Sequence, residues 1–393
     1  MISFDEASAL LAGVAAPLGL ETLPLAAAHG RILAGPVVAR IDSPRADVSA
    51  MDGYAVRAAD IAGGAALPVI GRSYPGQPFA DDMPPQACVR IFTGAALPAG
   101  ADRVVIQEEV AEADGIATFG ATGGPTFVRP RGSDFVIGRE LLAAGTKLTP
   151  GALLAIGGGD VGEVRVWRRP RVGLLVTGDE LVAPGTAAAH PAAIPDSVSL
   201  AVAALAADWG GEVVRIERLA DDLPSAVAAA GRMLDEVDVL VVTGGASVGE
   251  RDHAKAMVAP HGLELLFSKV AMKPGKPVWA GRAGGAIVLG LPGNPTSALV
   301  CARLFLAPLL CGMTGRPPAE ALAARTLPLA EAVAPVGSRE TFFRGHEDGG
   351  RVVLADHQDS NGQRVPGSAD LLVRLPAGDV ANPAGTLVPV LAL

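Results

Sequence analysis

Three short loops of the chain combine glycines with residue types that bind anions or metal ions. They are TGDE (177–180), TGGASVGERD (243–252) and GLPGNPTS (290–297), and each follows an apolar run typical of a buried strand. Glycines let backbone N–H groups approach an anion, and the start of a following helix favours negative charge. Three such loops in one region predict an anion-binding site, with ordinary turns as the alternative.

The known nucleotide-binding motifs are missing from these loops. Neither GxxxxGK[ST] nor a GxGxxG directly after an expected strand occurs, which argues against a simple ATPase or dinucleotide-binding protein. The histidines lack metal-ligand spacing, so a zinc site or a Cys/His nucleophile is not expected. The anion site must therefore be built differently.

Two lysines in the stiff turn MKPGKP (272–277) are candidates for holding an anion. Lys273 and Lys276 are two of only five lysines in the chain, whose positive charge is otherwise carried by arginine. A lysine supplies a mobile point charge for a phosphate or another oxyanion. A solvated surface turn explains the same residues equally well, and the sequence leaves both interpretations open.

Carboxylates accompany the glycine loops and suit a hard metal ion. Asp179, Glu180, Glu250 and Asp252 lie within the loops, and the pair Asp221–Asp222 precedes an expected helix. Mg²⁺ is usually held by one or two carboxylates together with substrate phosphates. Capping of the helix is the alternative for the Asp pair and is preferred for at least one member, and Glu250 could simply face solvent.

Two further carboxylates lie in turns far from this region. Asp52 lies in SAMDGYAV (49–56) and Asp134 in RPRGSDF (129–135). From the residues alone, each is as well explained by an ordinary turn as by a site.

The composition bounds the elements that must position these residues. At roughly 150 residues per domain, 393 residues indicate two to four domains, and 49 glycines with 32 prolines exclude a helical bundle. A net charge of −9 without a Lys/Arg block argues against nucleic-acid binding. Three cysteines without a CxxC pair fit a reducing compartment, and we expect a soluble cytoplasmic protein without a signal peptide.

Hydrophobic patterning predicts the elements. Ser3 and Glu6 form a capping box for an N-terminal helix, and the apolar run 297–313, interrupted by Arg303 and Pro308, is shorter than a membrane span. Residues 171–316 alternate strands and helices, which predicts a doubly wound, mainly parallel sheet. Residues 44–136 and those after about 317 indicate two β-rich regions.

Seven segments together resemble a known family. SAMDGYAV, IFTGAALP, RGSDF, TGDEL, TGGASVGERD, KPGKP and GLPGNPTSA occur in this order over almost the whole chain. They resemble the molybdopterin molybdotransferases, the MoeA-type enzymes related to the E domain of gephyrin. The resemblance implies that molybdate is inserted into adenylylated molybdopterin with Mg²⁺, releasing AMP and the molybdenum cofactor.

The resemblance also implies an architecture. It predicts a discontinuous linker and dimerisation domain (1–43 and 137–168), an inserted β-rich domain (44–136), an α/β molybdopterin-binding domain similar to molybdopterin adenylyltransferases (169–317), and a small C-terminal β barrel (318–393). The expected assembly is an elongated homodimer with a shared active site. Molybdopterin adenylyltransferase and acceptor molybdoenzymes are the expected partners, with no nucleic acid or membrane.

The family's functional residues carry over position by position. The resemblance implies catalytic roles for Asp52, Thr93, Asp134, Glu180 and Asp252, and metal binding by Asp221, Asp252 and Glu180. Substrate or anion binding falls on Gly244, Gly245, Ser247, Lys273, Lys276, Pro292, Gly293, Asn294, Pro295, Arg344 and Ser368.

The sequence departs from the family pattern at two positions. Val198 stands where the family usually has Asn, and His253 stands where Tyr is common.

Two other functions are alternatives. A molybdopterin adenylyltransferase needs only roughly 150 residues, so the flanking β regions argue against it. A gephyrin-like scaffold would lose the loop carboxylates, which are present here.

Overall fold

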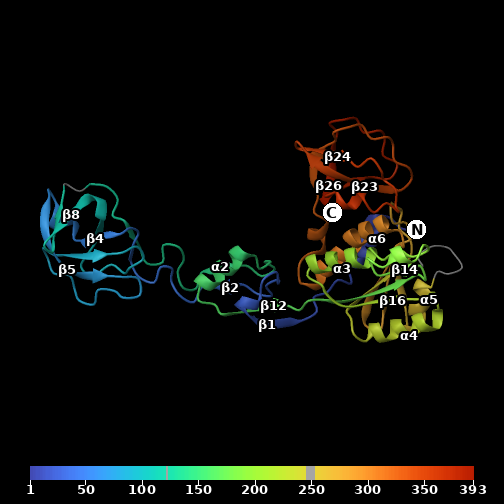
Figure 1. The fold of residues 1–393 in the computed structure, drawn as a ribbon, viewed down its shortest axis with the longest axis horizontal. Coiled ribbons are helices and arrows are strands. Elements are labelled where there is room, and N and C mark those ends of the chain that lie inside the picture. Colours follow the sequence, from blue (N-terminus) through green and yellow to red (C-terminus); the bar gives the residue numbers. More distant parts are fainter. Residues whose placement is uncertain (121–122, 245–252) are drawn as a thin grey trace. The chain divides into compact units, whose positions relative to one another are not determined.

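Two compact units make up the chain. The computed structural model describes residues 1–120, 123–244 and 253–393. One unit combines Met1–Glu21 with Val166–Leu393, and the other is the contiguous segment Thr22–Arg165. The chain passes between them within β1 (Leu20–Pro24) and β12 (Glu163–Trp167), which pair as a two-stranded sheet (Figure 1). The finer division into four domains stays a prediction.

The larger unit contains the predicted α/β sheet. Its strands are, in order across the sheet, β16 (Glu212–Leu219), β13 (Arg171–Thr177), β17 (Val239–Thr243), β21 (Ala286–Leu291), β20 (Trp279–Ala283) and β18 (Glu264–Phe267). The β13–β16, β13–β17 and β17–β21 pairs are parallel, whereas β20 and β18 add antiparallel pairs at one edge. The mainly parallel sheet is confirmed. The strand β20, which follows the KPGKP turn, was not expected.

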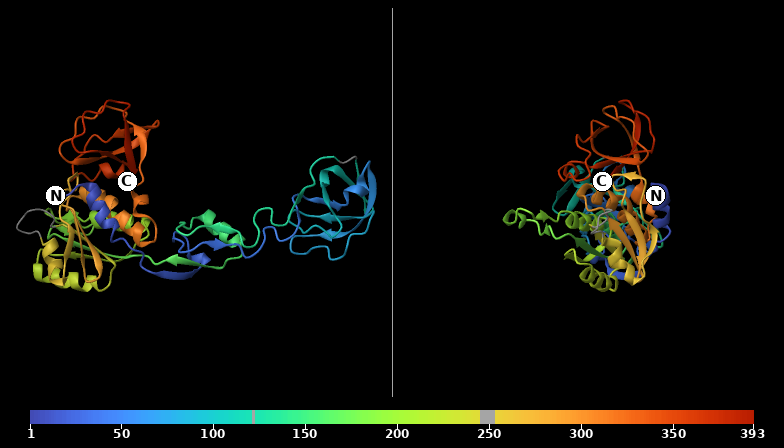
Figure 2. Two further views of the ribbon diagram at one scale, coloured as in Figure 1. Left: turned by 180° about the vertical axis from the view of Figure 1, so that it is seen from behind. Right: turned by 90° about the vertical axis from the view of Figure 1, so that its right-hand side faces the viewer.

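Alternating side chains of this sheet enter two separate cores. Leu174 and Val241 belong to one hydrophobic cluster, while Leu175 and Val242 belong to the other. Helices cover both faces, as Figure 1 and the view from behind in Figure 2 show. The helices are α3 (Val198–Asp208) and α6 (Pro295–Cys301) in the first cluster, and α4 (Leu223–Leu234) and α5 (Ala254–Val258) in the second.

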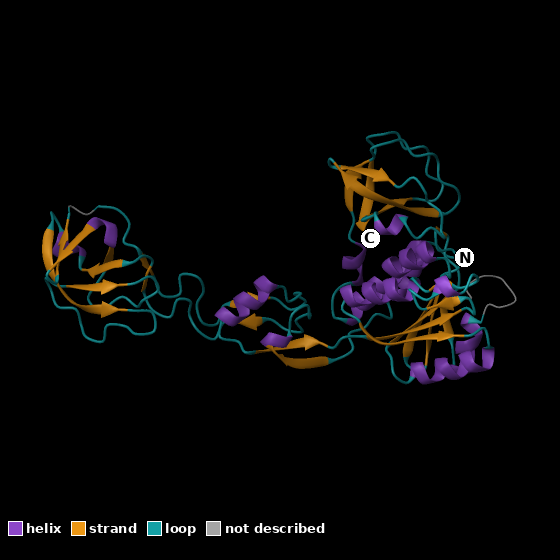
Figure 3. Ribbon diagram, viewed as in Figure 1, coloured by secondary structure: helices purple, strands orange, loops and turns teal. Residues whose placement is uncertain are grey.

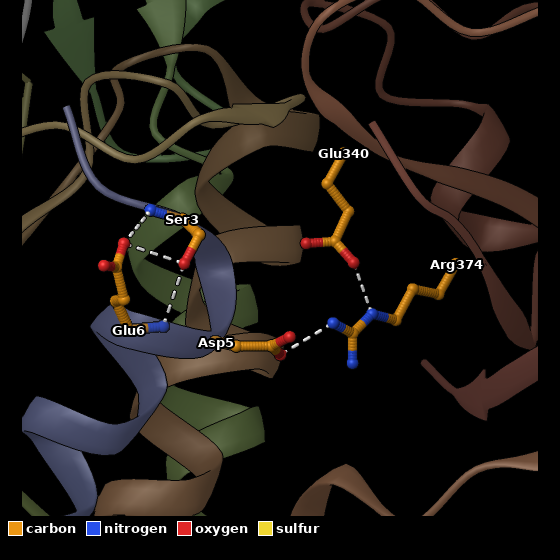
Figure 4. A network of polar contacts seen from close by, with 5 residues as sticks. All are labelled: Ser3, Asp5, Glu6, Glu340 and Arg374. Carbon is orange, nitrogen blue, oxygen red and sulfur yellow. Dashed lines mark hydrogen bonds and ion pairs between the residues drawn. The ribbon is translucent and has the colours of Figure 1, made fainter. Parts of the chain in front are cut away.

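The predicted capping box begins α1 (Phe4–Ala12). Ser3 N–H donates to Glu6 Oε2 over 2.8 Å, and Glu6 N–H donates to Ser3 Oγ over 3.1 Å (Figure 4). Phe4 points inward and makes edge contacts with Phe305 and Phe342, at ring-centroid distances of 5.6 and 5.0 Å. The helix is therefore part of the core of the larger unit.

Arg374, in the C-terminal region, pairs with a carboxylate of α1 and with a second carboxylate outside the helix. Arg374 Nη2 lies 2.7 Å from Asp5 Oδ1, and Arg374 Nε lies 2.5 Å from Glu340 Oε1 (Figure 4). The guanidinium carbon also lies 4.9 Å from the centroid of the Phe4 ring. One cation thus binds two carboxylates from separate elements and covers an aromatic ring.

A long apolar helix follows the last glycine loop. It comprises α6, a π-helical segment (Ala302–Leu306) and α7 (Ala307–Met313), so it continues through both Arg303 and Pro308. The widened turn precedes Pro308, whose ring lacks the N–H that would bond Leu304 in an α-helix. Residues Pro295–Met313 are, contrary to expectation, long and apolar enough to span a membrane, but 94% of that window is buried within the protein. This is a core helix.

A second sheet of the larger unit contains the C-terminal strands. It consists of β19 (Met272–Lys273), β23 (Glu340–Asp348), β25 (Leu371–Leu375), β26 (Leu387–Ala392) and β22 (Arg325–Pro328), with β24 (Arg351–Leu354) paired to β23. The KPGKP turn therefore starts in this sheet. Closure of these strands into a barrel stays a prediction.

The unit Thr22–Arg165 is mostly strands and loops (Figure 3). Its main sheet has the order β7 (Arg103–Ile106), β4 (Gly53–Val56), β6 (Cys88–Ile91), β5 (Ala65–Ser73), β9 (Ile116–Phe119) and β8 (Val110–Ala113). Its α-helix, within the described residues, is α2 (Pro150–Gly158). Short strand pairs are β2 (Val37–Val38) with β11 (Glu140–Leu142) and β3 (Val48–Ser49) with β10 (Val128–Arg129); β14 (Leu181–Val182) and β15 (Ile194–Pro195) form another pair in the larger unit.

Candidate active site

A cavity of about 800 Å³ lies at the carboxyl ends of β13, β17 and β21. In open α/β sheets this is the edge at which ligands bind. The cavity brings together eight of the residues that the sequence singled out: Glu180, Asp221, Gly244, Lys276, Pro292, Gly293, Asn294 and Pro295. All three glycine loops therefore reach one site.

The backbone at the end of β17 requires a glycine. Gly244 has a φ of +88°, and a Cβ at this position would lie 2.5 Å from the carbonyl oxygen of Thr177. The end of β13 thus leaves no room for a side chain at this position of the β17 end. The hydroxyl of Thr243, which precedes this glycine and also lines the cavity, has no hydrogen-bond partner within the described residues. It is a buried polar group at the edge of the cavity lining.

Glu180 and Asp221 contribute two carboxylates to the cavity lining. The Glu180 side chain folds back over Gly178, where a Cβ would lie 2.9 Å from Glu180 Oε1. Asp221 N–H donates to Asp179 Oδ1 over 3.0 Å, which joins the loop after β13 to the loop after β16. The carboxylates therefore come from neighbouring, mutually hydrogen-bonded loops.

The neighbouring Asp222 has the structural role expected for one member of the Asp pair. It is the N-cap of α4, and Ser225 N–H donates to its Oδ2 over 3.0 Å. The hydrogen bonds from Ser225 lower the pKa of the Asp222 carboxyl. Asp221 faces the cavity and Asp222 caps the helix.

A buried carboxylate in the cavity wall was not identified from the sequence. Asp196 is 2% exposed, accepts hydrogen bonds from the hydroxyl and N–H of Ser199 over 2.6 and 3.0 Å, and pairs with Arg218 over 2.8 Å. These contacts join the start of α3 to β16. The IPDS segment, a polar pair before an apolar helix, carried the signal for it. Val198, the departure from the family pattern, also lines the cavity.

The lysines are arranged differently from the expectation. Lys276 lines the cavity, together with Lys269, which the sequence analysis did not select. Lys273 is exposed on β19 and is not among the lining residues. The signal for Lys269 was its position, four residues before Lys273 in a chain with five lysines.

A loop from the C-terminal region closes one side of the cavity. Asn361 and Gln363 are lining residues, and Asn294 Nδ2 donates to Ser360 Oγ over 3.0 Å at the start of α6. Thr296 Oγ1 donates to the carbonyl of Gly362. The loop is thereby fastened to the residues that follow β21.

Arg344 and Ser368, both predicted to bind an anion, lie outside the cavity lining. Arg344 is 2% exposed, donates to the Asp359 carbonyl over 3.2 Å, and has a pKa lowered by burial. Its guanidinium holds the start of the loop 359–363. Ser368 Oγ donates to the Val365 carbonyl over 3.2 Å.

The unit Thr22–Arg165 contains the remaining candidates. Thr93 N–H and Oγ1 both donate to Asp52 Oδ1, over 2.8 and 2.7 Å, and these bonds lower the pKa of Asp52. Asp134 N–H donates to the Ser43 carbonyl over 2.9 Å. Asp42, not selected from the sequence, accepts from Arg131 Nε over 2.6 Å and fixes the turn before Asp134.

Part of the central glycine loop is outside the described residues. Gly245, Ser247, Glu250 and Asp252 fall there, so their predicted or discussed roles have no structural description. Within the described ranges, no cluster of three or more His, Cys, Asp or Glu side chains with metal-binding geometry occurs. Glu180 and Asp221 are the described members of the predicted metal set.

Two family models match the chain in sequence. Residues 2–157 match the model described as "MoeA N-terminal region (domain I and II)". Residues 173–311 match "Probable molybdopterin binding domain", and this range includes the three glycine loops of the cavity. The matches define a protein of molybdenum cofactor biosynthesis.

Individual relatives narrow the class to one enzyme family. The chain is 36% identical to the molybdopterin molybdenumtransferase of Haemophilus influenzae over 89% of this chain and 88% of that protein. It is 34% identical to that of Synechococcus elongatus over 100% of both. A crystal structure of a molybdopterin biosynthesis MoeA protein from Pyrococcus horikoshii matches with a TM-score of 0.82 and 29% identity, over 100% of this chain and 99% of that one. The chain belongs to the molybdopterin molybdenumtransferase family and is an enzyme.

Proposed function

We propose that the cavity binds adenylylated molybdopterin, and that the enzyme inserts molybdate into it with Mg²⁺-dependent release of AMP. The observation that carries the proposal is the composition of the cavity lining. Three carboxylates (Glu180, Asp221 and the Arg218-paired Asp196), two lysines and the ends of three parallel strands surround a volume of about 800 Å³. Such a lining offers cationic groups to phosphate or molybdate oxygens and carboxylate oxygens to a hard cation.

The carboxylates present fit Mg²⁺. The donor set of Glu180 and Asp221 has the hard oxygens and the number that a phosphate-bound Mg²⁺ takes from protein. When bound, the ion supplies charge neutralisation at phosphate oxygens. In our proposal Glu180 and Asp221 hold it, with Asp252 as a further ligand.

In our proposal the lysines and the backbone bind the anionic groups of the substrates. Lys276 and Lys269 line the cavity, and their ammonium groups attract the phosphates or molybdate. Lys273, at the start of the turn that contains Lys276, stays a candidate for binding the anion.

The proposal extends to a homodimer with a shared site. Asp52, Thr93 and Asp134 of a second copy complete the site, in line with the family resemblance. The prearranged Asp52–Thr93 pair supports a chemical role for this turn. A molybdopterin adenylyltransferase supplies the substrate in the cytoplasm, and molybdoenzymes receive the product.

The test is AMP release from adenylylated molybdopterin, with and without molybdate and Mg²⁺. We expect the wild-type protein to release AMP only when molybdate and Mg²⁺ are both present, and Glu180→Gln to release none. Glu217→Gln is the matched control, because Glu217 lies on β16 and pairs with Arg232 over 3.1 Å outside the cavity lining. Wild-type protein that releases no AMP under any of these conditions, or a fully active Glu180→Gln, would contradict the proposal.

A further inference from the structure

Arg90 on β6 lies between two aromatic rings in the unit Thr22–Arg165. Its guanidinium carbon is 4.8 Å from the Tyr54 ring centroid and 5.0 Å from the Phe92 ring centroid. Tyr74 stacks on Phe92, with centroids 4.6 Å apart and planes at 8°. A cation held by two rings has little freedom to move.

The same guanidinium bonds to residues on both sides of Asp52. Arg90 Nη1 donates to the carbonyl of Gly53 over 2.9 Å, and Nη2 donates to Gln107 Oε1. Gln107 N–H donates in turn to the Asp52 carbonyl over 3.1 Å. Thr93, which holds the Asp52 carboxylate, directly follows the stacked Phe92. Arg90 therefore touches the backbone after Asp52, the partner of Asp52 and the ring before Thr93.

A neutral tyrosine and a second arginine lie close to Arg90. Tyr54 donates its hydroxyl to Glu112, and burial is the largest cause that raises the pKa of Tyr54, to about 12. Tyr54 therefore stays neutral near physiological pH. Arg72 lies opposite Arg90 in the β5–β6 register, and its Nη1 donates to the Tyr74 hydroxyl over 3.4 Å.

We propose that Arg90 is a positioning residue, which fixes the Asp52–Thr93 pair in the geometry that the reaction uses. The reaction part of this inference rests on the proposed function, which gives Asp52 a chemical role. The ordering part rests on the contacts alone. A merely structural arginine would stabilise the sheet without controlling the Asp52 turn.

Arg90→Gln in the full-length protein separates the two roles. Gln removes the positive charge and the two guanidinium nitrogens that donate to Gly53 and Gln107. Arg90→Lys keeps the charge but loses this paired donor geometry. Arg103→Gln is the matched control, because Arg103 lies on β7, next to β4, and donates to the Gly124 carbonyl over 3.3 Å, away from the Asp52 turn.

Two readouts decide the outcome. We expect hydrogen exchange of the Thr93 amide to speed up at least about tenfold in Arg90→Gln and less in Arg90→Lys, since local opening is what exchange reports. We expect kcat for AMP release to fall at least about tenfold with KM changed less than about twofold, as for an interaction made in the transition state. Arg103→Gln should change neither. If Arg90→Gln fails to fold, Arg90→Lys carries both measurements.

Failure of this inference is distinguishable from failure of the proposed function. Unchanged Thr93 exchange overturns the positioning role whatever the activity does. Faster exchange with unchanged kcat also overturns it, because the ordered pair would then be irrelevant to the reaction. Wild-type protein without AMP release refutes the proposed function, and with it the reaction part of this inference, whereas the exchange measurement still decides the ordering part.

Discussion

Thr93 gives both of its donors to a single carboxylate oxygen of Asp52, the N–H over 2.8 Å and the hydroxyl over 2.7 Å. The two residues are 41 positions apart and lie in separate loops of one unit. Two bonds to one atom fix the rotation of the carboxylate and favour its ionised form.

Thr93→Ala should raise the pKa of Asp52 but leave it below its ordinary value. The backbone N–H of residue 93 remains, and it is the larger cause of the lowered pKa. A carboxyl whose folded pKa is lowered stabilises the fold above its unfolded pKa and loses this contribution as the pH falls through the folded pKa. Thr93→Ala should therefore lose less stability on acidification than wild type. A carboxyl NMR titration and acid unfolding measure both effects, with the exposed Thr118→Ala as control.

Gly244→Ala should destabilise the protein more than Gly262→Ala. Both glycines have positive φ, +88° and +78°, but a Cβ meets the Thr177 carbonyl at the first position and nothing within 4 Å at the second. We expect Gly262→Ala to lower the free energy of unfolding by about 1–2 kcal/mol, from the backbone conformation alone. Gly244→Ala should lower it by roughly 2–4 kcal/mol, because the clash with the Thr177 carbonyl adds to the conformational cost. Urea unfolding measures the difference. Equal losses would show that the strand ends separate readily.

Lys269→Gln and Lys276→Gln should each weaken the binding of substrate or molybdate. A charge-assisted contact contributes about 1.5–3 kcal/mol, so we expect at least a roughly tenfold higher concentration for half-saturation. Thermal unfolding should change little, because both side chains are exposed. Lys147→Gln, in the other unit, is the control. Saturation curves identical to wild type in the double variant would exclude an anion site here.

Arg374→Met should destabilise the larger unit. It leaves Glu340, whose side chain is 12% exposed, without its cation. Breaking a fully buried pair costs about 3–5 kcal/mol, and partial exposure of Arg374 reduces this to roughly 1–3 kcal/mol. Arg325→Met is the control, because the Arg325–Glu347 pair is more exposed, at 57% and 33%. A melting temperature lowered equally by both variants would contradict the expectation.

Mixed dimers test the shared site. Asp52→Asn and Glu180→Gln subunits should each be inactive alone, and together they should recover some AMP release. Recovery follows if one site of the mixed dimer combines an intact Asp52 with an intact Glu180. Absence of recovery, with subunit exchange shown by differently tagged chains, would place both residues in the same subunit's site.

The sequence predicted the location of the cavity better than it predicted the individual residues that line the cavity. Strands such as β13 and β17 were predictable because their apolar runs end at glycine loops, and the carboxyl ends of parallel strands share one edge. Asp196 and Lys269 were missed in spite of weak signals in the sequence, because their place in the lining depends on which loops fold toward that edge. Arg344 was assigned to an anion site, yet side-chain burial in a sheet follows from strand register, which the local sequence does not specify.

The insertion of Thr22–Arg165 into the larger unit sets an order for folding during synthesis. The inserted segment is contiguous, so all of its contacts are available once residue 165 has left the ribosome. Phe4, in contrast, packs on Phe305 and Phe342, and Asp5 pairs with Arg374, 369 positions later. The helix α1 therefore stays without its core until the segment from Phe305 to Arg374 has been made. Its apolar face is exposed to chaperones and aggregation for longer than any other helix of the described chain.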